Sequence, residues 1–198
     1  MPCNNACGWW KDPFVAVDNA HSQPSVQGGA SQKPLTLVVV PYRALVLSHL
    51  HESASWFPCL SSEHDMSEIT AEIHACSVIY STPEKIVKNI TFQQLLIHSA
   101  NRIHIVAVDE AHLLLEQACF RPDLIACIGI LHKYIPRAVR LAVTATSRIA
   151  DSKLLLQAAL MPSDSHIVRC SLDRSNCLIS IAPQLDKKRQ AQAHQIRT

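Results

Sequence analysis

The chain has 198 residues, of which 48% are hydrophobic and 17% are charged, and its formal net charge is +2. This composition is typical of a globular protein and excludes an intrinsically disordered one. No apolar run approaches the ~20 residues of a membrane span, and so mild a charge neither favours nor excludes a nucleic-acid partner. The length fits one α/β domain of ordinary size.

The first 34 residues are predicted to be irregular, because they contain four prolines and the linker-like stretch SVQGGASQ. Only residues 13–18, PFVAVD, favour a strand. Cys3 and Cys7, followed by His21, leave a zinc site as an open but disfavoured alternative, because such a site needs about four ligands and no second pair lies nearby in the sequence. No basic segment precedes an apolar core here, so we expect no secretory signal. We therefore expect the eight cysteines to be reduced in an intracellular protein.

From residue 35 onward, strands are predicted to alternate with helices, because short β-branched runs are separated by amphipathic stretches. The predicted strands are residues 35–40, 76–82, 103–110, 138–146 and 166–171, and the predicted helices are residues 42–55, 61–75, 84–98, 123–134 and 147–160. This alternation predicts an α/β fold with a mainly parallel sheet that helices cover on both faces. Ligands of such sheets bind at the carboxyl ends of the strands.

Two acids, Asp109 and Glu110, end the most hydrophobic predicted strand. An aspartate in this position is typical of a Walker-B carboxylate, which holds Mg²⁺, usually through water, while the neighbouring glutamate orients the attacking water. The simpler alternative is that both acids cap the following helix. The pair by itself does not decide between these interpretations.

Six segments in one order resemble the first RecA-like domain of RecQ-like DNA helicases, a branch of helicase superfamily two. They are LVVVPYRALV (37–46, motif Ia), YSTPEKI (80–86, the Thr-Pro-Glu motif), DEAH (109–112, motif II), FRPDL (120–124), TAT (144–146, motif III) and SLDRSN (171–176). Each segment is weak evidence by itself, but the ordered set is specific. The leucine-rich stretch HLLLEQACFRPDL further resembles divergent RecQ-like helicases of fungi.

The resemblance implies a three-layer RecA-like domain with ATP and Mg²⁺ as cofactors, single-stranded DNA as partner and a nuclear location. It implies that Asp109 holds Mg²⁺, that Glu110 activates water, and that His112 with Thr144, Ala145 and Thr146 couples nucleotide state to DNA. It also implies DNA-backbone contacts, which are independent of sequence; their residues are Arg43, Thr82, Pro83 and Arg121.

Each implied residue also has a purely structural alternative. Arg43 fits a solvated helix start, Thr82 fits a helix cap, and Arg121 fits a local ion pair with Asp123. Thr144 and Thr146 are equally compatible with ordinary strand ends.

The phosphate-binding loop of such motors is missing from the sequence. The pattern Gly-x4-Gly-Lys-[Ser/Thr] does not occur, and only residues 19–34 separate the predicted first strand from the motif Ia strand. A P-loop, its helix and a return loop need about 25 residues. We interpret this as excision of the P-loop, by a real deletion or a mispredicted splice junction, and expect ATP and Mg²⁺ binding to be weak or absent.

The resemblance divides the chain into an irregular segment (1–34), a partial helicase domain (35–171) and an exit linker with a polar tail (172–198). A second RecA-like domain, with its arginine finger, would begin near residue 180. The aromatic-rich loop of RecQ proteins is replaced by LLLEQAC at 113–119. We therefore expect the chain by itself to unwind no DNA and to hydrolyse ATP near background. An apolar sheet face left without its helix predicts marginal stability or aggregation.

Three functional interpretations remain open. The chain is a fragment of an ATP-driven 3′-to-5′ helicase, a non-enzymatic module that binds nucleic acid or a partner protein, or a truncated gene product without function. A Rossmann-type dehydrogenase is excluded, because no Gly-x-Gly-x-x-Gly pattern follows the first predicted strand.

Overall fold

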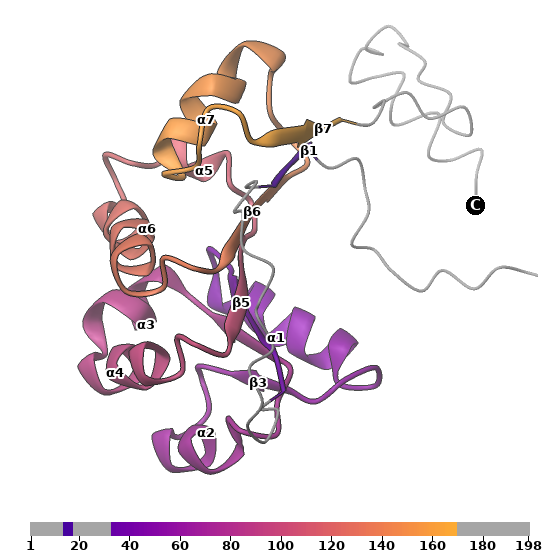
Figure 1. Cartoon of the computed structure of the whole chain (residues 1–198), viewed down its shortest axis with the longest axis vertical. Helices are drawn as coiled ribbons and strands as arrows, with labels where there is room; N and C mark the ends of the chain where they lie inside the picture. Colours follow the sequence, from indigo (N-terminus) through magenta and orange to yellow (C-terminus); the bar gives the residue numbers. More distant parts are fainter. Residues whose placement is uncertain (1–13, 18–32, 170–198) are drawn as a thin grey trace, which may run out of the picture.

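The computed structural model describes residues 14–17 and 33–169, which form one seven-stranded sheet in the order β3-β4-β2-β5-β6-β1-β7 (Figure 1). Strands β3, β4, β2, β5 and β6 are all parallel, which confirms the predicted α/β fold. The strands are β1 (Phe14–Val17), β2 (Leu35–Val39), β3 (Cys59–Ser61), β4 (Val78–Ser81), β5 (Ile103–Val108), β6 (Val139–Thr144) and β7 (His166–Val168). Edge strand β3 was not predicted, because three residues are too short for a periodic signal.

The five predicted helical stretches are confirmed in order, and the short helix at Leu113–Glu116 was not predicted. The helices are α1 (Arg43–Ser53), α2 (Met66–Glu72), α3 (Pro83–Lys88), α4 (Ile90–His98), α5 (Leu113–Glu116), α6 (Pro122–Tyr134) and α7 (Ser152–Ala158), with the short 3₁₀ helix η2 (Ile149–Asp151). The stretch 84–98 splits at Asn89, whose side chain accepts the backbone N–H of Phe92 at 2.9 Å and so begins a new helix. In the part of the chain that the structure describes, no helix is long and apolar enough to cross a membrane.

The main core lies on one face of the sheet. Helices α2, α3, α4 and α6 cover this face, and α7 extends the cover over β6 (Figure 1). Inward-facing residues Leu35, Leu37 and Val39 of β2 are almost completely buried there. A continuous apolar run therefore forms a central strand because helices and neighbouring strands remove it from water.

The opposite face is covered in part. Among the helices of the described ranges, only α1 packs on it, against Val38, Val40 and Tyr80 through Val46. Beyond α1, Ile105 in the middle of central strand β5 is 38% exposed, whereas its neighbour Val106 is buried. The layers are thus helix, sheet and helix, and among the described residues Ile105 leaves part of an apolar surface exposed on this second face.

Strand β1 differs from the expectation. It occupies the slot between β6 and β7, but it runs antiparallel to both, with Phe14 opposite Thr144 and Val17 opposite Leu141. Residues 13–18 resemble the first core strand of the RecQ-like family, which normally runs into the P-loop, but β1 runs away from the carboxyl edge of the sheet. This reversed strand ends at the amino edge of the sheet, where β2 begins.

Candidate active site and nucleic-acid face

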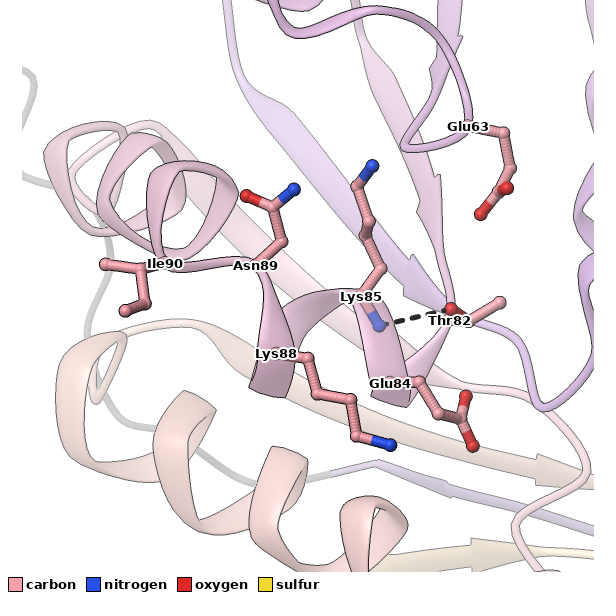
Figure 2. Close-up of a pocket in the computed structure, with 7 residues that line it drawn as sticks. All are labelled: Glu63, Thr82, Glu84, Lys85, Lys88, Asn89 and Ile90. Carbon is pink, nitrogen blue, oxygen red and sulfur yellow. Dashed lines mark hydrogen bonds between the residues drawn. The ribbon is translucent and has the colours of Figure 1, made fainter.

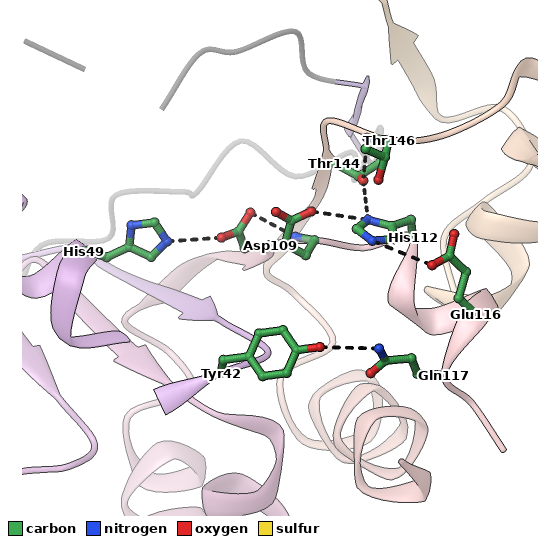
Figure 3. Close-up of polar contacts among 9 residues, drawn as sticks. Tyr42, His49, Asp109, His112, Glu116, Gln117, Thr144 and Thr146 are labelled. Atoms are coloured by element: carbon green, nitrogen blue, oxygen red, sulfur yellow. Dashed lines mark hydrogen bonds and ion pairs between the residues drawn. The ribbon is translucent and has the colours of Figure 1, made fainter. Parts of the chain in front are cut away.

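Asp109 directly follows β5 at the carboxyl edge of the sheet. Its backbone N–H donates to the carbonyl of Val39, and its Oδ1 accepts the N–H of Glu110 at 2.9 Å. Its Oδ2 lies 3.1 Å from Nε2 of His49 in α1 (Figure 3). The carboxylate is therefore oriented from both sides, by its own turn and by a helix that precedes it by 60 residues.

His49 was not among the predicted site residues. It lies one turn after Val46, a fully buried residue on the sheet-facing side of α1. Side chains three positions apart share a helix face, so this spacing could have indicated that His49 points toward the sheet. Its ring also approaches that of Tyr80, with centroids 5.8 Å apart.

Glu110 has a strained backbone, with φ at 49° in the left-handed region. Such a conformation costs a non-glycine residue about 1–2 kcal/mol and is concentrated at functional sites. Burial, and then the neighbouring carboxylate of Asp109, raises the pKa of Glu110 above its usual value. The alternative that the two acids cap the next helix is wrong, because α5 begins after His112 and has no side-chain cap.

The structure brings the motif II histidine to motif III. His112 Nδ1 is hydrogen-bonded to Thr144 Oγ1 at 2.7 Å and lies 3.2 Å from Oε2 of Glu110. The backbone N–H of Thr146 donates to the same Thr144 hydroxyl at 3.2 Å (Figure 3). Ala145 and Thr146 are exposed, whereas Thr144 is buried. A movement of the turn after β6 would therefore change the position of His112, and through it the surroundings of the Glu110 carboxylate.

The Thr-Pro-Glu motif forms the first turn of α3. Thr82 is the cap, and its Oγ1 accepts the N–H of Lys85 at 3.3 Å, with Pro83 in the first turn (Figure 2). The structural alternative for Thr82 is thus confirmed, and DNA binding by Thr82 and Pro83 stays a prediction. A cavity of about 500 Å³ opens beside this turn; its lining residues are Glu63, Thr82, Glu84, Lys85, Lys88, Asn89 and Ile90.

Arg43 begins α1 at the same edge. Its side chain is 73% exposed and pairs with Glu63 at 2.6 Å. The predicted solvated helix start is therefore confirmed. Because its side chain is long and exposed, Arg43 can also leave the carboxylate of Glu63 and pair with a phosphate instead.

Arg121 does not pair with Asp123, contrary to the local alternative. Its Nη2 contacts Glu84 Oε1 at 2.5 Å and donates to the carbonyl of Pro41 at 2.6 Å, while Asp123 pairs with Lys88. The reason is that Arg121 is the N-cap residue, before α6, whereas Asp123 lies inside the first turn of the helix, so their side chains diverge. Packing of α3 against α6 then supplies a separate partner to each.

The residues fit a magnesium nucleotide only in part. Asp109 is a suitable oxygen ligand at the correct edge. A phosphate cradle requires a glycine-rich loop and lysine at a helix N-terminus, and the four glycines of the sequence include none with that context. Gly129 lies inside α6. Nucleotide phosphates therefore have no matching site in these residues.

In the described ranges, no group of three or more histidine, cysteine, aspartate or glutamate side chains could hold a metal ion. Cys3, Cys7 and His21 lie outside those ranges. Cys59, Cys76, Cys119 and Cys127 are free thiols. Burial raises the pKa of Cys76 to about 11 and also raises that of Cys127, so both behave as core hydrophobes.

Replacing Glu110 with glutamine is expected to stabilise the protein slightly at neutral pH. A raised pKa means that the folded state favours the protonated carboxyl, so its stabilisation is present below about pH 4.5 and is lost as pH rises through the raised value. Glutamine removes the cost of the ionised form; since the side chain is partly exposed, we expect a gain below about 0.5 kcal/mol. Urea unfolding at two pH values measures it: the gain of Glu110→Gln should disappear in acid, and a gain that grows in acid would contradict the assignment.

Comparisons with known proteins agree with the motifs. Residues 16–153 match the DEAD/DEAH box helicase family. The chain is 35% identical over 125 residues to ATP-dependent DNA helicase Q1 of Pongo abelii and of Mus musculus, covering 57% of this chain and 19% of each relative. It is 29% identical over 125 residues to ATP-dependent DNA helicase Q-like 4B of Arabidopsis thaliana, covering 62% of this chain and 11% of that protein.

The chain thus spans about a fifth or less of the length of these relatives. Among solved structures, the DUF1998 helicase MrfA bound to DNA matches with a TM-score of 0.45 and 18% identity, over 65% of this chain and 20% of that one. So distant a likeness carries no argument about function. The family match covers well over half of the sequence and includes the DEAH tetrad at 109–112. The chain therefore belongs to the DEAD/DEAH box helicase family, within which it is RecQ-like.

Proposed function

We propose that this chain is the DNA-binding part of a RecQ-like helicase motor and that it hydrolyses ATP only near background by itself. The proposed family activity is ATP-driven 3′-to-5′ DNA unwinding, and the proposed location is the nucleus, where such a substrate is found. The reversed direction of β1 is the observation that carries this proposal. It removes the strand end from which a P-loop would continue.

The proposal that the chain hydrolyses ATP only near background rests on which parts of a nucleotide site lie at the carboxyl edge of the sheet. Asp109, Glu110 and His112 are in place, and His112 contacts Thr144. Most contacts to nucleotide phosphates in such motors come from the P-loop backbone and its lysine. Without these contacts, a Mg²⁺ ion held by Asp109 would bind a nucleotide only weakly. The acidic residues therefore keep their arrangement although the chain binds little ATP.

The DNA-binding half rests on the N-terminal ends of α1 and α3. Thr82 and Lys85 line the cavity, Pro83 lies between them in the chain, and Arg43 pairs with Glu63, another lining residue. Internal carboxylates already pair with three nearby cations, through the contacts Arg43–Glu63, Lys88–Asp123 and Arg121–Glu84. The local charge is therefore almost balanced. We infer that binding to single-stranded DNA is weak and uses about one to three phosphate contacts.

A paired assay with one protein sample tests both halves. By fluorescence anisotropy, we expect a single-stranded oligonucleotide to bind with a log–log salt slope of about −0.7 to −2, since single strands give about −0.7 per phosphate contact. In the same buffer with Mg²⁺ and ATP, we expect phosphate release to equal that of a protein-free blank, with and without DNA.

Glu110→Gln is the control for hydrolysis, because it removes the residue that would activate water while leaving the DNA edge unchanged. Release that DNA stimulates and that falls to the blank in Glu110→Gln would show that the chain is an active ATPase. Absence of salt-sensitive binding would remove the DNA half of the proposal.

A non-enzymatic module that binds a protein partner is a second candidate. The exposed position of Ile105 in a central strand favours it, since an apolar sheet surface of this kind is normally covered. Failure of DNA binding together with a monomer that loses solubility on concentration would favour this second candidate.

A further inference from the structure

Tyr42 is an aromatic residue held in one orientation at the carboxyl edge of the sheet, beside the residues predicted to contact DNA. It directly precedes α1, as its N-cap. The guanidinium carbon of Arg121 lies 5.0 Å from the centre of the Tyr42 ring. The Tyr42 hydroxyl accepts a hydrogen bond from Nε2 of Gln117 at 3.3 Å (Figure 3). Nevertheless, 45% of Tyr42 is exposed. Since the guanidinium covers one side of the ring, the opposite side is the part available to a ligand.

The support under Tyr42 is itself rigid. Arg121 bonds to Glu84 and to the carbonyl of Pro41, the residue before Tyr42. The ring is therefore fixed by two side chains and by its own backbone before any ligand arrives. An aromatic side chain that is already ordered loses little conformational freedom on binding, which makes it an efficient contact surface.

The position of Tyr42 matches the proposed path of a single strand. Its neighbour Arg43 offers an exposed cation for a phosphate. Strands β2 and β4 are parallel with Val39 opposite Ser81, so Tyr42 and the Thr82–Pro83 turn emerge from adjacent strand ends. Tyr42 thus offers a flat ring to a base, and the adjacent Arg43 offers a positive charge to a phosphate.

A second observation concerns the loop that follows the DEAH tetrad. Residues 113–119 contain no aromatic side chain, yet Gln117 of this segment is the residue that bonds to the Tyr42 hydroxyl. Tyr42 at the start of α1 is therefore connected to this loop through one hydrogen bond.

We propose that Tyr42 is a stacking platform for one unpaired base of single-stranded DNA. This inference rests on the proposed function, because it adds a base contact to the phosphate contacts proposed there. Every base has a flat face that stacks on an aromatic ring, so the contact tolerates any sequence. The exposed Arg43 beside the ring can exchange Glu63 for a phosphate, which favours a nucleic acid over a protein partner.

The test compares two oligonucleotides of equal length and phosphate number, an oligothymidylate and an abasic strand. We expect the wild-type protein to bind oligothymidylate about 5- to 100-fold more tightly than the abasic strand, the range that one stacked base contributes. Tyr42→Ala should lower affinity for oligothymidylate to that for the abasic strand and leave abasic binding unchanged. Tyr42→Phe keeps the ring and should retain most of the preference.

Trp56→Ala is the matched control, because Trp56 is an exposed aromatic residue beyond the other end of α1 and should have no effect. Photocrosslinking with iodouracil in the oligonucleotide should yield a peptide modified at Tyr42. Equal, salt-sensitive binding of both strands by the wild-type protein would contradict base stacking while leaving the proposed backbone binding in place. No binding of either strand would overturn both. A Tyr42→Ala variant that keeps its preference for oligothymidylate would overturn the stacking role even if its melting temperature is lower.

Discussion

Replacing Arg102 with alanine is expected to lower the free energy of unfolding by about 3 kcal/mol. Arg102 is only 6% exposed, and its guanidinium donates four hydrogen bonds to backbone carbonyls, two of them to Lys33 and one each to Ile73 and His74. Alanine would leave three carbonyls without this donor, at a cost of about 1 kcal/mol each. The bonds connect Lys33, just before β2, to Ile73 and His74, just after α2. Their loss should therefore loosen the amino edge of the sheet, at the opposite ends of the strands from Asp109.

Arg102→Lys is the informative control, because lysine keeps the charge but cannot present a planar fork to three carbonyls. We expect it to recover less than half of the lost stability. Urea unfolding followed by circular dichroism measures both variants at low and high salt. Since the acceptors are neutral carbonyls, the loss should be the same at both salt concentrations. A loss that vanishes in high salt, or one below about 0.5 kcal/mol, would refute this account.

Replacing Arg121 with methionine is expected to lower the free energy of unfolding by about 2 kcal/mol, because it removes a partly buried charge pair and leaves Glu84 without its partner. The carbonyl of Pro41 loses its donor in the same step. Adding Glu84→Gln to Arg121→Met should restore part of the loss, since the orphaned carboxylate becomes neutral. A double-mutant cycle over the two positions measures this coupling directly.

Lys88→Met serves as the comparison for Arg121. Lys88 joins the same two helices by pairing with Asp123, but it is largely exposed to solvent. An exposed pair of this kind contributes little, so we expect no measurable change in stability. Equal losses in Lys88→Met and Arg121→Met, or a cycle with no coupling, would show that the contact of Arg121 with Glu84 is not special.

Much of the fold followed from local patterns in the chain. The β-branched run at 35–40 and the apolar run before Asp109 predicted β2 and β5, because a strand buried on both faces must be apolar at every position. The order of the motifs placed Asp109, His112, Thr82 and Arg43 at strand ends and helix starts, where the structure has them.

The partners of the site residues could not be obtained in this way. The spacing of apolar residues in PFVAVD is the same in either direction, so periodicity cannot show that β1 is reversed. That direction is set by pairing with β6 and β7, which lie more than 120 residues further along the chain. His49 beside Asp109 and Glu84 beside Arg121 likewise depend on how helices pack after the sheet has formed.

Local sequence was therefore sufficient for the longer helices and strands, the family and the acids at the end of β5, but not for the short elements β3 and α5. Tertiary structure alone decided what those residues contact: Asp109 meets His49, Arg121 supports Tyr42, and the strand that should lead to a phosphate leads away from it. The physical reason is that backbone preferences and hydrophobic periodicity act over a few neighbouring residues. Charge pairing and strand direction are instead set by contacts between distant segments, which the chain makes only when it is folded.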